Sequence, residues 1–262
     1  LLLRFGSGKP VLAAGFVGGL LLLFIVLKTE PLALAASLGL RAVSGQTASL
    51  ATGFDIRWLG FSYIAFRLLH VLRDHQSGKP NQLNLQEFII YVLFFPALSA
   101  GPIDRAPRFV QDLRKHFQLT SADLYAGSRR LVVGVFKKFV LADTLAVLAL
   151  NGALANQTAS GGWLWLMLYA YALRIYFDFS GYTDIAVGLG RLFGINLPEN
   201  FAKPYLKSNL TTFWNSWHIT LAQWFRAYFF NPVTRAMRTR SKPVPMPLII
   251  LTGQLGTMLL IG

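Results

Sequence analysis

The chain alternates between long apolar stretches and short polar stretches that carry most of its charge. A helix that spans a membrane needs about 20 mostly apolar residues. Five stretches approach this length: Val11 to Leu27, Gln86 to Ile103, Leu131 to Leu154, Trp163 to Phe179 and Val244 to Gly262. The pattern predicts an all-α, polytopic integral membrane protein.

Two stretches interrupt this simple pattern. Phe61 to Leu72 carries Arg67 and His70 among apolar residues, which favours a buried or re-entrant segment over one that faces lipid. The stretch from Gln86 is expected to break near Pro96. Backbone carbonyls freed at such a break are tolerated at membrane depth only where they are buried in protein or line water. The alternative is an ordinary helix stop followed by a cytoplasmic anchor.

Composition supports a membrane protein over a soluble one. Charged residues make up 14% and hydrophobic residues 54% of the 262 residues, whereas a soluble domain has about 25% charged residues. The net charge is nevertheless +14. The positive-inside rule places such an excess in cytoplasmic loops, here Asp104 to His116, Arg129-Arg130 and Arg235 to Lys242. We therefore expect a multi-pass protein of the inner or plasma membrane that contacts the lipid bilayer and does not bind nucleic acid.

The chain contains no linker or repeat that would divide it. We expect one domain over residues 1–262, with its core motifs between residues 86 and 232. It opens on Leu1 and stops at Gly262 inside an apolar run, so both ends are expected to be truncated.

A second polar feature lies in the aromatic run from Tyr176 to Gly190. Asp178 and Asp184 are embedded there, and Arg174 precedes Asp178 by four residues, so these two side chains can pair on a helix. A buried ion pair that fixes the helix register is the structural alternative to a functional site. The glycines at 181, 188, 190 and 194 follow no strand and are expected to allow close helix packing.

A third feature is the stretch from Leu210 to Phe230, in which aromatic residues recur at helical spacing. One continuous helix would place Trp214, Trp217 and five other apolar residues on one face, with His218 at its border. Asn215 and Arg226 would lie on the other side. Such a helix is typical of a membrane interface. His218 can be a hydrogen-bonded core residue or a functional imidazole. Without cysteine, and without metal-ligand spacing, no metal site is expected.

Three motifs together carry a family resemblance. GPIDRAPRF, FDFSGYTDIAVGLGRLFGINLPENFAKPYL and FWNSWHITLAQWFRAYFFNP, within about Gly60 to Pro232, resemble the membrane-bound O-acyltransferase (MBOAT) superfamily. They are most similar to its bacterial branch, which includes enzymes of alginate O-acetylation and of teichoic-acid D-alanylation. The resemblance implies a compact helical bundle with a central tunnel and interfacial or re-entrant helices.

The resemblance also implies a chemistry. An acyl thioester, acetyl-CoA or an acyl carrier protein, would approach from the cytoplasm, and an exported hydroxyl acceptor from outside; no bound cofactor is implied. His218 matches the family's earlier histidine, which lines the tunnel or supports the base. The family's second histidine, in a Trp-His-Gly context, is expected beyond Gly262. Asn200 and Lys203 are family-like and expected to be structural. The expected substrate-binding residues are Asp178, Asp184, Trp214, Asn215, Trp217 and Arg226.

The acceptor stays open between two polymers. The first motif favours D-alanyl transfer to a teichoic-acid-like polymer, and the second favours O-acetylation of an exported cell-envelope polysaccharide, which we expect. An extracytoplasmic acyl-handling protein would accompany acetylation, and an acyl carrier protein D-alanylation. A non-catalytic transporter or scaffold is the alternative from a different functional class.

Overall fold

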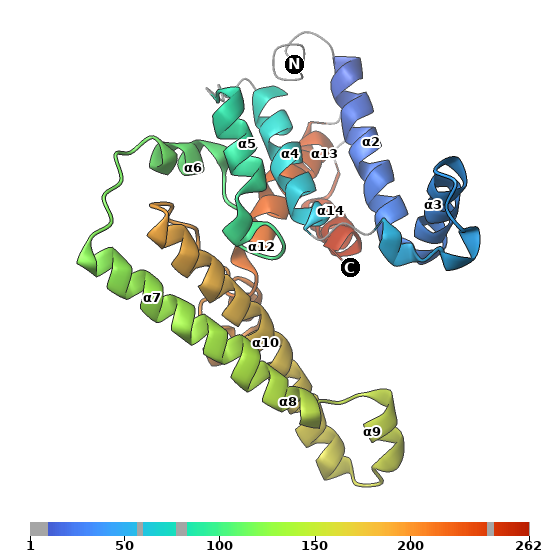
Figure 1. The fold of residues 1–262 in the computed structure, drawn as a ribbon, viewed down its shortest axis with the longest axis vertical. Coiled ribbons are helices and arrows are strands. Elements are labelled where there is room, and N and C mark those ends of the chain that lie inside the picture. Colours follow the sequence, from blue (N-terminus) through green and yellow to red (C-terminus); the bar gives the residue numbers. More distant parts are fainter. Residues whose placement is uncertain (1–9, 57–59, 77–82, 240–243, 262) are drawn as a thin grey trace. The chain divides into compact units, whose positions relative to one another are not determined.

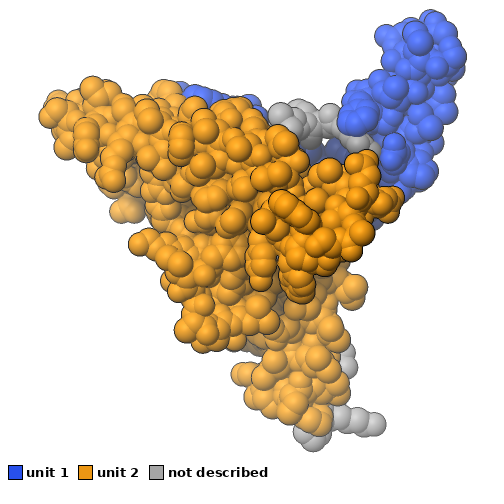
Figure 2. Space-filling view, turned by 90° about the horizontal axis from the view of Figure 1, so that it is seen from below, with its two compact units in different colours: residues 1–99, 105–107 blue, residues 100–104, 108–262 orange. Residues whose placement is uncertain are grey.

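The computed structural model describes residues 10–56, 60–76, 83–239 and 244–261. Residues 240–242 of the predicted basic stretch from Arg235 to Lys242 lie outside the described residues, as does Gly262. The described residues form helices and no strand, as predicted. They divide into two compact units, coloured separately in Figure 2, and each is described by itself.

Unit 1, residues 1–99 and 105–107, contains the N-terminal helices. These are α2 (Pro10–Lys28), α3 (Glu30–Val43), α4 (Phe61–Gln76) and α5 (Leu85–Leu93), with the 3₁₀ turns η1 (Ala48–Leu50), η2 (Gly53–Asp55) and η3 (Phe95–Ala97). Unit 2, residues 100–104 and 108–262, holds the remainder. It comprises α6 (Ala106–Leu113, whose first two residues belong to unit 1), α7 (Ser121–Val135), η4 (Phe136–Ala142), α8 (Asp143–Leu148), α9 (Gly152–Gln157), α10 (Gly161–Leu192), η5 (Pro204–Leu206), α11 (Leu210–Trp214), α12 (Ile219–Phe225), η6 (Arg226–Phe230), α13 (Asn231–Arg238) and α14 (Met246–Ile261).

The predicted spans agree only in part with these helices. Among the described residues, no single helix combines the length and apolar content of a membrane crossing. Gly15–Lys28 and Glu30–Val43 meet that criterion only as a pair, and the chain bends by 98° between them. The predicted break near Pro96 is confirmed, because α5 ends at Leu93, but the predicted continuation of the span to Ile103 is wrong, since only the 3₁₀ turn η3 follows.

The side chain of Arg67 donates hydrogen bonds to the backbone carbonyl groups that are left without partners where α5 ends. Its guanidinium donates to the carbonyls of Tyr91 (3.1 Å), Val92 (2.9 Å) and Ala97 (2.7 Å). Arg67 is 3% exposed, so the prediction of a buried segment with buried polar groups is confirmed. A charged side chain thus satisfies helix-terminal carbonyls that have no partner within the helix.

The core of unit 2 is an antiparallel pair formed by α7 and α10, which lie side by side (Figure 1). Gly127 faces Gly188, and Gly134 faces Gly181, so that the two backbones approach closely. The predicted packing role of Gly181 and Gly188 is confirmed. After Val135, helix α7 continues without interruption through the π-helical segment η4 into α8.

A methyl group at Gly181 is expected to disrupt this pair. The Cβ of Gly181→Ala would lie 2.8 Å from the carbonyl oxygen of Gly134 and 2.8 Å from the backbone nitrogen of Lys138. Overpacking against backbone costs about 1–3 kcal/mol, so the thermal unfolding midpoint of the detergent-solubilised protein should fall. Gly161→Ala is the matched control, because nothing lies within 4 Å of a Cβ at that position of the same helix. An equal shift in both variants would contradict the packing role.

Candidate functional site

His218 lies at a break in the chain. The prediction of one helix from Leu210 to Phe230 is wrong, since α11 ends at Trp214 and α12 begins at Ile219. Asn209 caps α11, its side-chain oxygen accepting from the backbone N–H of Thr212. His218 is the residue before α12 and has left-handed backbone angles, φ 43° and ψ 53°. This break divides the predicted aromatic face between two short helices.

The imidazole of His218 is half-buried, with one ring nitrogen turned into the protein. Its ring meets that of Phe179, on α10, edge to face with 4.7 Å between centroids. The Nε2 atom is buried and has no hydrogen-bond partner among the described residues. Burial lowers the pKa of His218 to about 4, because it disfavours the charged form. The ring is therefore neutral at pH 7, and the described residues do not supply the partner expected of a satisfied core histidine.

Six aromatic side chains form a continuous cluster beside His218, and we call them the aromatic cluster. Trp217 is its centre, with ring centroids 5.1 Å from Phe201, 5.8 Å from Phe213 and 6.1 Å from both Tyr176 and Tyr205. Phe179 completes it, 5.1 Å from Phe201. Sequence reasoning placed Trp217 here but missed Tyr176, Phe179, Phe201 and Tyr205. The spacing of Tyr176 and Phe179, one turn apart on α10, was the available signal.

Three buried polar side chains near this cluster also have an unpaired atom. Ser180 Oγ, Thr183 Oγ1 and Asn200 Nδ2 have no hydrogen-bond partner among the described residues, and each residue is at most 3% exposed. Helical spacing places Thr183, four residues after Phe179, on the face of α10 that bears Phe179. Buried polar groups are nearly always hydrogen-bonded, so such atoms indicate a place for water or for a polar ligand.

A chain of hydrogen bonds joins the three sequence motifs beneath His218. The hydroxyl of Thr220 accepts from the backbone N–H of Ile103 (3.0 Å) and donates to Asn200 Oδ1 (2.5 Å). The backbone carbonyl of Asn200 accepts from the N–H of Ile219 (2.9 Å). Asn200 is fully buried and Thr220 is 4% exposed. The motifs of residues 101–104, 198–201 and 217–220 thus meet in one polar network.

The two predicted aspartates join α10 to the helix beside it. Asp184 is 7% exposed and accepts from Arg130 (2.9 Å) and from Lys137 Nζ (2.7 Å). Arg130 also binds both carboxylate oxygens of Glu199, at 2.5 Å each. The two partners of Asp184 were not predicted, because they lie 54 and 47 residues away in the sequence.

The predicted pairing of Asp178 with Arg174 does not form in the part of the chain that the structure describes. Asp178 pairs instead with Lys138, and Arg174 is exposed. A carboxylate on α10 reaches the lysine across the helix pair because the neighbouring helix approaches so closely at Gly134 and Gly181.

Three further predicted substrate residues lie on the surface of the protein and are not members of the aromatic cluster. Trp214, Asn215 and Arg226 are all exposed. Trp214 contacts Phe213, with 5.1 Å between ring centroids. Their role in binding stays a prediction, as do those of Asp178, Asp184 and Trp217.

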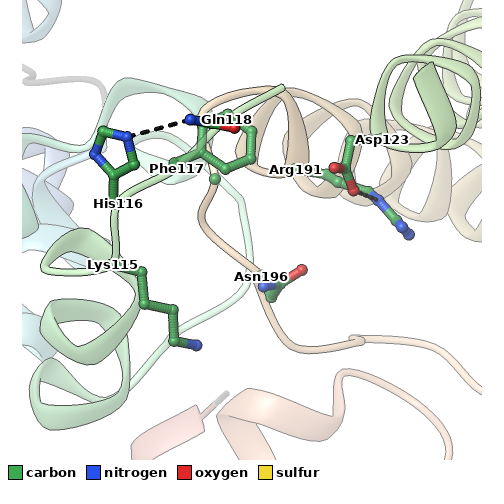
Figure 3. A pocket seen from close by; sticks show the side chains of 8 residues that line it. Lys115, His116, Phe117, Gln118, Asp123, Arg191 and Asn196 are labelled. Atoms are coloured by element: carbon green, nitrogen blue, oxygen red, sulfur yellow. Dashed lines mark hydrogen bonds and ion pairs between the residues drawn. The ribbon is translucent and has the colours of Figure 1, made fainter. Parts of the chain in front are cut away.

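A separate pocket of about 440 Å³ lies at the C-terminal end of α10 (Figure 3). Its lining consists of Lys115, His116, Phe117, Gln118, Asp123, Arg191, Gly194 and Asn196. Lys115 pairs with Asp112 (2.6 Å), and Arg191 with Asp123 (3.3 Å). Burial raises the pKa of Asp112, but hydrogen bonds from Lys115 and Asn196 outweigh it and leave that pKa below its usual value. The pocket's charges are therefore largely compensated within the protein.

Comparison with known proteins identifies relatives in two groups. The model of one family, described as MBOAT, membrane-bound O-acyltransferase family, matches residues 20–244. The teichoic acid D-alanyltransferase of Bacillus subtilis is 38% identical over 181 residues, which cover 67% of this chain and 45% of the relative. The probable alginate O-acetylase AlgI of Pseudomonas aeruginosa is 39% identical over 173 residues, 66% of this chain and 33% of the relative. The chain thus spans between a third and a half of the length of these relatives.

Proposed function

Because the chain belongs to the membrane-bound O-acyltransferase family, we propose that it is part of an enzyme that acylates an exported cell-envelope polysaccharide. The acyl group would come from a thioester donor on the cytoplasmic side and pass to a polymer hydroxyl. Acetyl is the first candidate for this group. The observation that carries the proposal is the neutral imidazole of His218 beside the aromatic cluster, whose Nε2 atom is buried and has no hydrogen-bond partner among the described residues.

The proposed step requires one proton acceptor. The imidazole Nε2 takes the proton from the acceptor hydroxyl while the hydroxyl oxygen attacks the thioester carbonyl. A carbon–oxygen bond forms, the carbon–sulfur bond breaks, and the proton passes to the departing thiolate. A neutral histidine suits this role, since a protonated ring cannot accept. His218 either performs the step or orients a second histidine that the family resemblance implies.

The surroundings of His218 suit a sugar hydroxyl. The unpaired side-chain atoms of Ser180, Thr183 and Asn200 are available for hydrogen bonds to a polar ligand. The rings of Trp217 and Phe201 supply apolar surface and keep bulk water away, which strengthens polar interactions inside the site. Asp178, Asp184, Trp214, Asn215 and Arg226 complete the proposed acceptor path. The donor is acetyl-CoA or an acyl carrier protein, and an extracytoplasmic acyl-handling protein is the proposed partner.

D-alanyl transfer to a teichoic-acid-like polymer is the second candidate. It is favoured by the relative named teichoic acid D-alanyltransferase, whose identity of 38% is close to the 39% of the alginate O-acetylase. In that case the donor would be a D-alanyl thioester on a carrier protein, and the step at His218 would be unchanged.

The test is transfer by the full-length protein that contains this segment, reconstituted in liposomes. We expect labelled acetyl thioester to give covalently acetylated polysaccharide, detected after the polymer is separated from the donor. Transfer of labelled D-alanine with no transfer of acetyl would favour the second candidate. Movement of a solute across the bilayer without any covalent product would contradict both and favour a transporter.

A further inference from the structure

We propose that Asn200 is a positioning residue, which acts through Ile219 and Thr220 to hold His218 in its left-handed conformation. The effect of this positioning on catalysis rests on the proposed function, whereas the positioning itself can be measured without an assay of acyl transfer. The argument depends on backbone geometry and on hydrogen bonds in unit 2.

The conformation of His218 needs external support. Its φ of 43° lies in the left-handed region, where the Cβ of an L-residue crowds the following carbonyl. Residues held there persist only where the surrounding structure over-determines them, and they concentrate at functional sites. Such a conformation at the residue before a helix also prevents the ordinary cap, and the His218 side chain makes no capping hydrogen bond.

Asn200 replaces this missing cap from a distant part of the chain. The first backbone N–H groups of a helix have no partner within it and are usually satisfied by the residue at the N-cap. Here the N–H of Ile219 donates to the backbone carbonyl of Asn200 at 2.9 Å. The N–H of Thr220 donates to Asn200 Oδ1 at 3.4 Å. The imidazole of His218 is thereby released from capping and left with a free Nε2.

The hydroxyl of Thr220 secures Asn200 in this position. It donates to Asn200 Oδ1 and accepts from the backbone N–H of Ile103, so both neighbours lose a partner if the hydroxyl is removed. On the other side of His218, the N–H of Ala202 donates to the carbonyl of Ser216 at 3.0 Å. The segment from Asn200 to Ala202 therefore holds the chain both before and after the histidine.

Thr220→Val in the full-length protein tests this positioning, because it removes the hydroxyl and keeps the shape. We measure the rate at which diethylpyrocarbonate modifies His218 at pH 7, by mass spectrometry of the peptide. Losing a hydrogen bond of ordinary strength should raise this rate by about tenfold, since the structure around the buried Nε2 would open more often and expose it to the reagent. His116, which is exposed, is the internal standard and should react at one rate in all variants.

Thr220→Ser restores the hydroxyl and should return the rate for His218 to the original value. Thr252→Val is the matched control, because Thr252 is exposed and its hydroxyl bonds to Leu248 of its own helix. In the transfer assay, a misplaced imidazole should lower kcat by about 10- to 100-fold with little change in KM. Asn200→Ala provides the same measurements if Thr220→Val does not accumulate as folded protein.

The outcomes separate the two proposals. Unchanged modification of His218 in folded Thr220→Val would overturn the positioning, whatever the enzyme transfers. Faster modification that serine reverses, in a protein that transfers no acyl group, would support the positioning and contradict the proposed function. Faster modification of both His218 and His70, which is 1% exposed, would indicate general unfolding and would also overturn the positioning.

Discussion

Replacing His218 with alanine is expected to lower acyl transfer by the full-length protein by about 10²- to 10⁴-fold, the range that a general base contributes. The reason is that no other described side chain offers a neutral, unpaired imidazole beside the aromatic cluster. The measurement is the initial rate of labelled product formation in liposomes. His116→Ala is the control, because His116 is exposed and lies outside the cluster, and its rate should stay near that of the unmodified protein.

The pH dependence checks the same assignment with an independent readout. A histidine of ordinary pKa, near 6.5, would become protonated and inactive as the pH falls through that value. Burial lowers the pKa of His218 to about 4, so the imidazole stays neutral well below pH 6.5. We expect kcat/KM to be independent of pH between about 5.5 and 7. A steep decline across this interval, or full activity in His218→Ala, would argue against His218 as the proton acceptor.

Replacing Asp184 with alanine is expected to reduce the stability of unit 2 by about 3 kcal/mol, the lower end of the cost of breaking a buried ion pair. Asp184 is the shared partner of Arg130 and Lys137, and its removal leaves Lys137 facing α10 without its carboxylate. Arg130 keeps Glu199, which is why the lower end applies. The measurement is the free energy of unfolding in a denaturant titration of the solubilised protein.

Asp178→Ala is the matched control on the same helix. Its carboxylate is 54% exposed and pairs with Lys138, and exposed ion pairs contribute about 0–1 kcal/mol. We expect the Asp184 variant to unfold at clearly lower denaturant concentration than the Asp178 variant. An equal decrease in the free energy of unfolding in both variants would show that burial does not determine how much each aspartate contributes to stability.

Local sequence patterns were sufficient for part of the fold. The helix break before Pro96, the burial of Arg67 and His70, and the close approach at Gly181 and Gly188 follow from residue types and short spacings. These features depend on what a proline, a buried charge or a glycine does within one turn of helix. The same reasoning overestimated helix length around Gln86, because apolar content alone does not show where hydrogen bonding stops.

The site itself depends on contacts between distant residues. Helical spacing placed His218 beside aromatic residues, yet it could not show the break from 215 to 218, because Asn200 stabilises that break from 18 residues upstream. It paired Asp178 with Arg174 on one helix, whereas the lysine of the adjacent helix lies closer. Whether residues 1–262 form a single domain, and whether a tunnel passes beside His218, stay predictions.

The π-helical segment η4 (Phe136–Ala142) gives this chain a place where its length can change. A π segment amounts to one residue inserted into an α-helix, and its widened turn absorbs the extra residue, so the helices on either side keep the faces they present. Deleting one residue there would restore regular geometry and leave α8 with nearly the same face toward α10. Deleting one residue within the regular helix α7 would instead rotate everything that follows by about 100°, the angle per residue of an α-helix. Variants that lose one residue within 136–142, apart from Lys137 and Lys138, which pair with α10, should therefore be better tolerated than variants that lose one within α7.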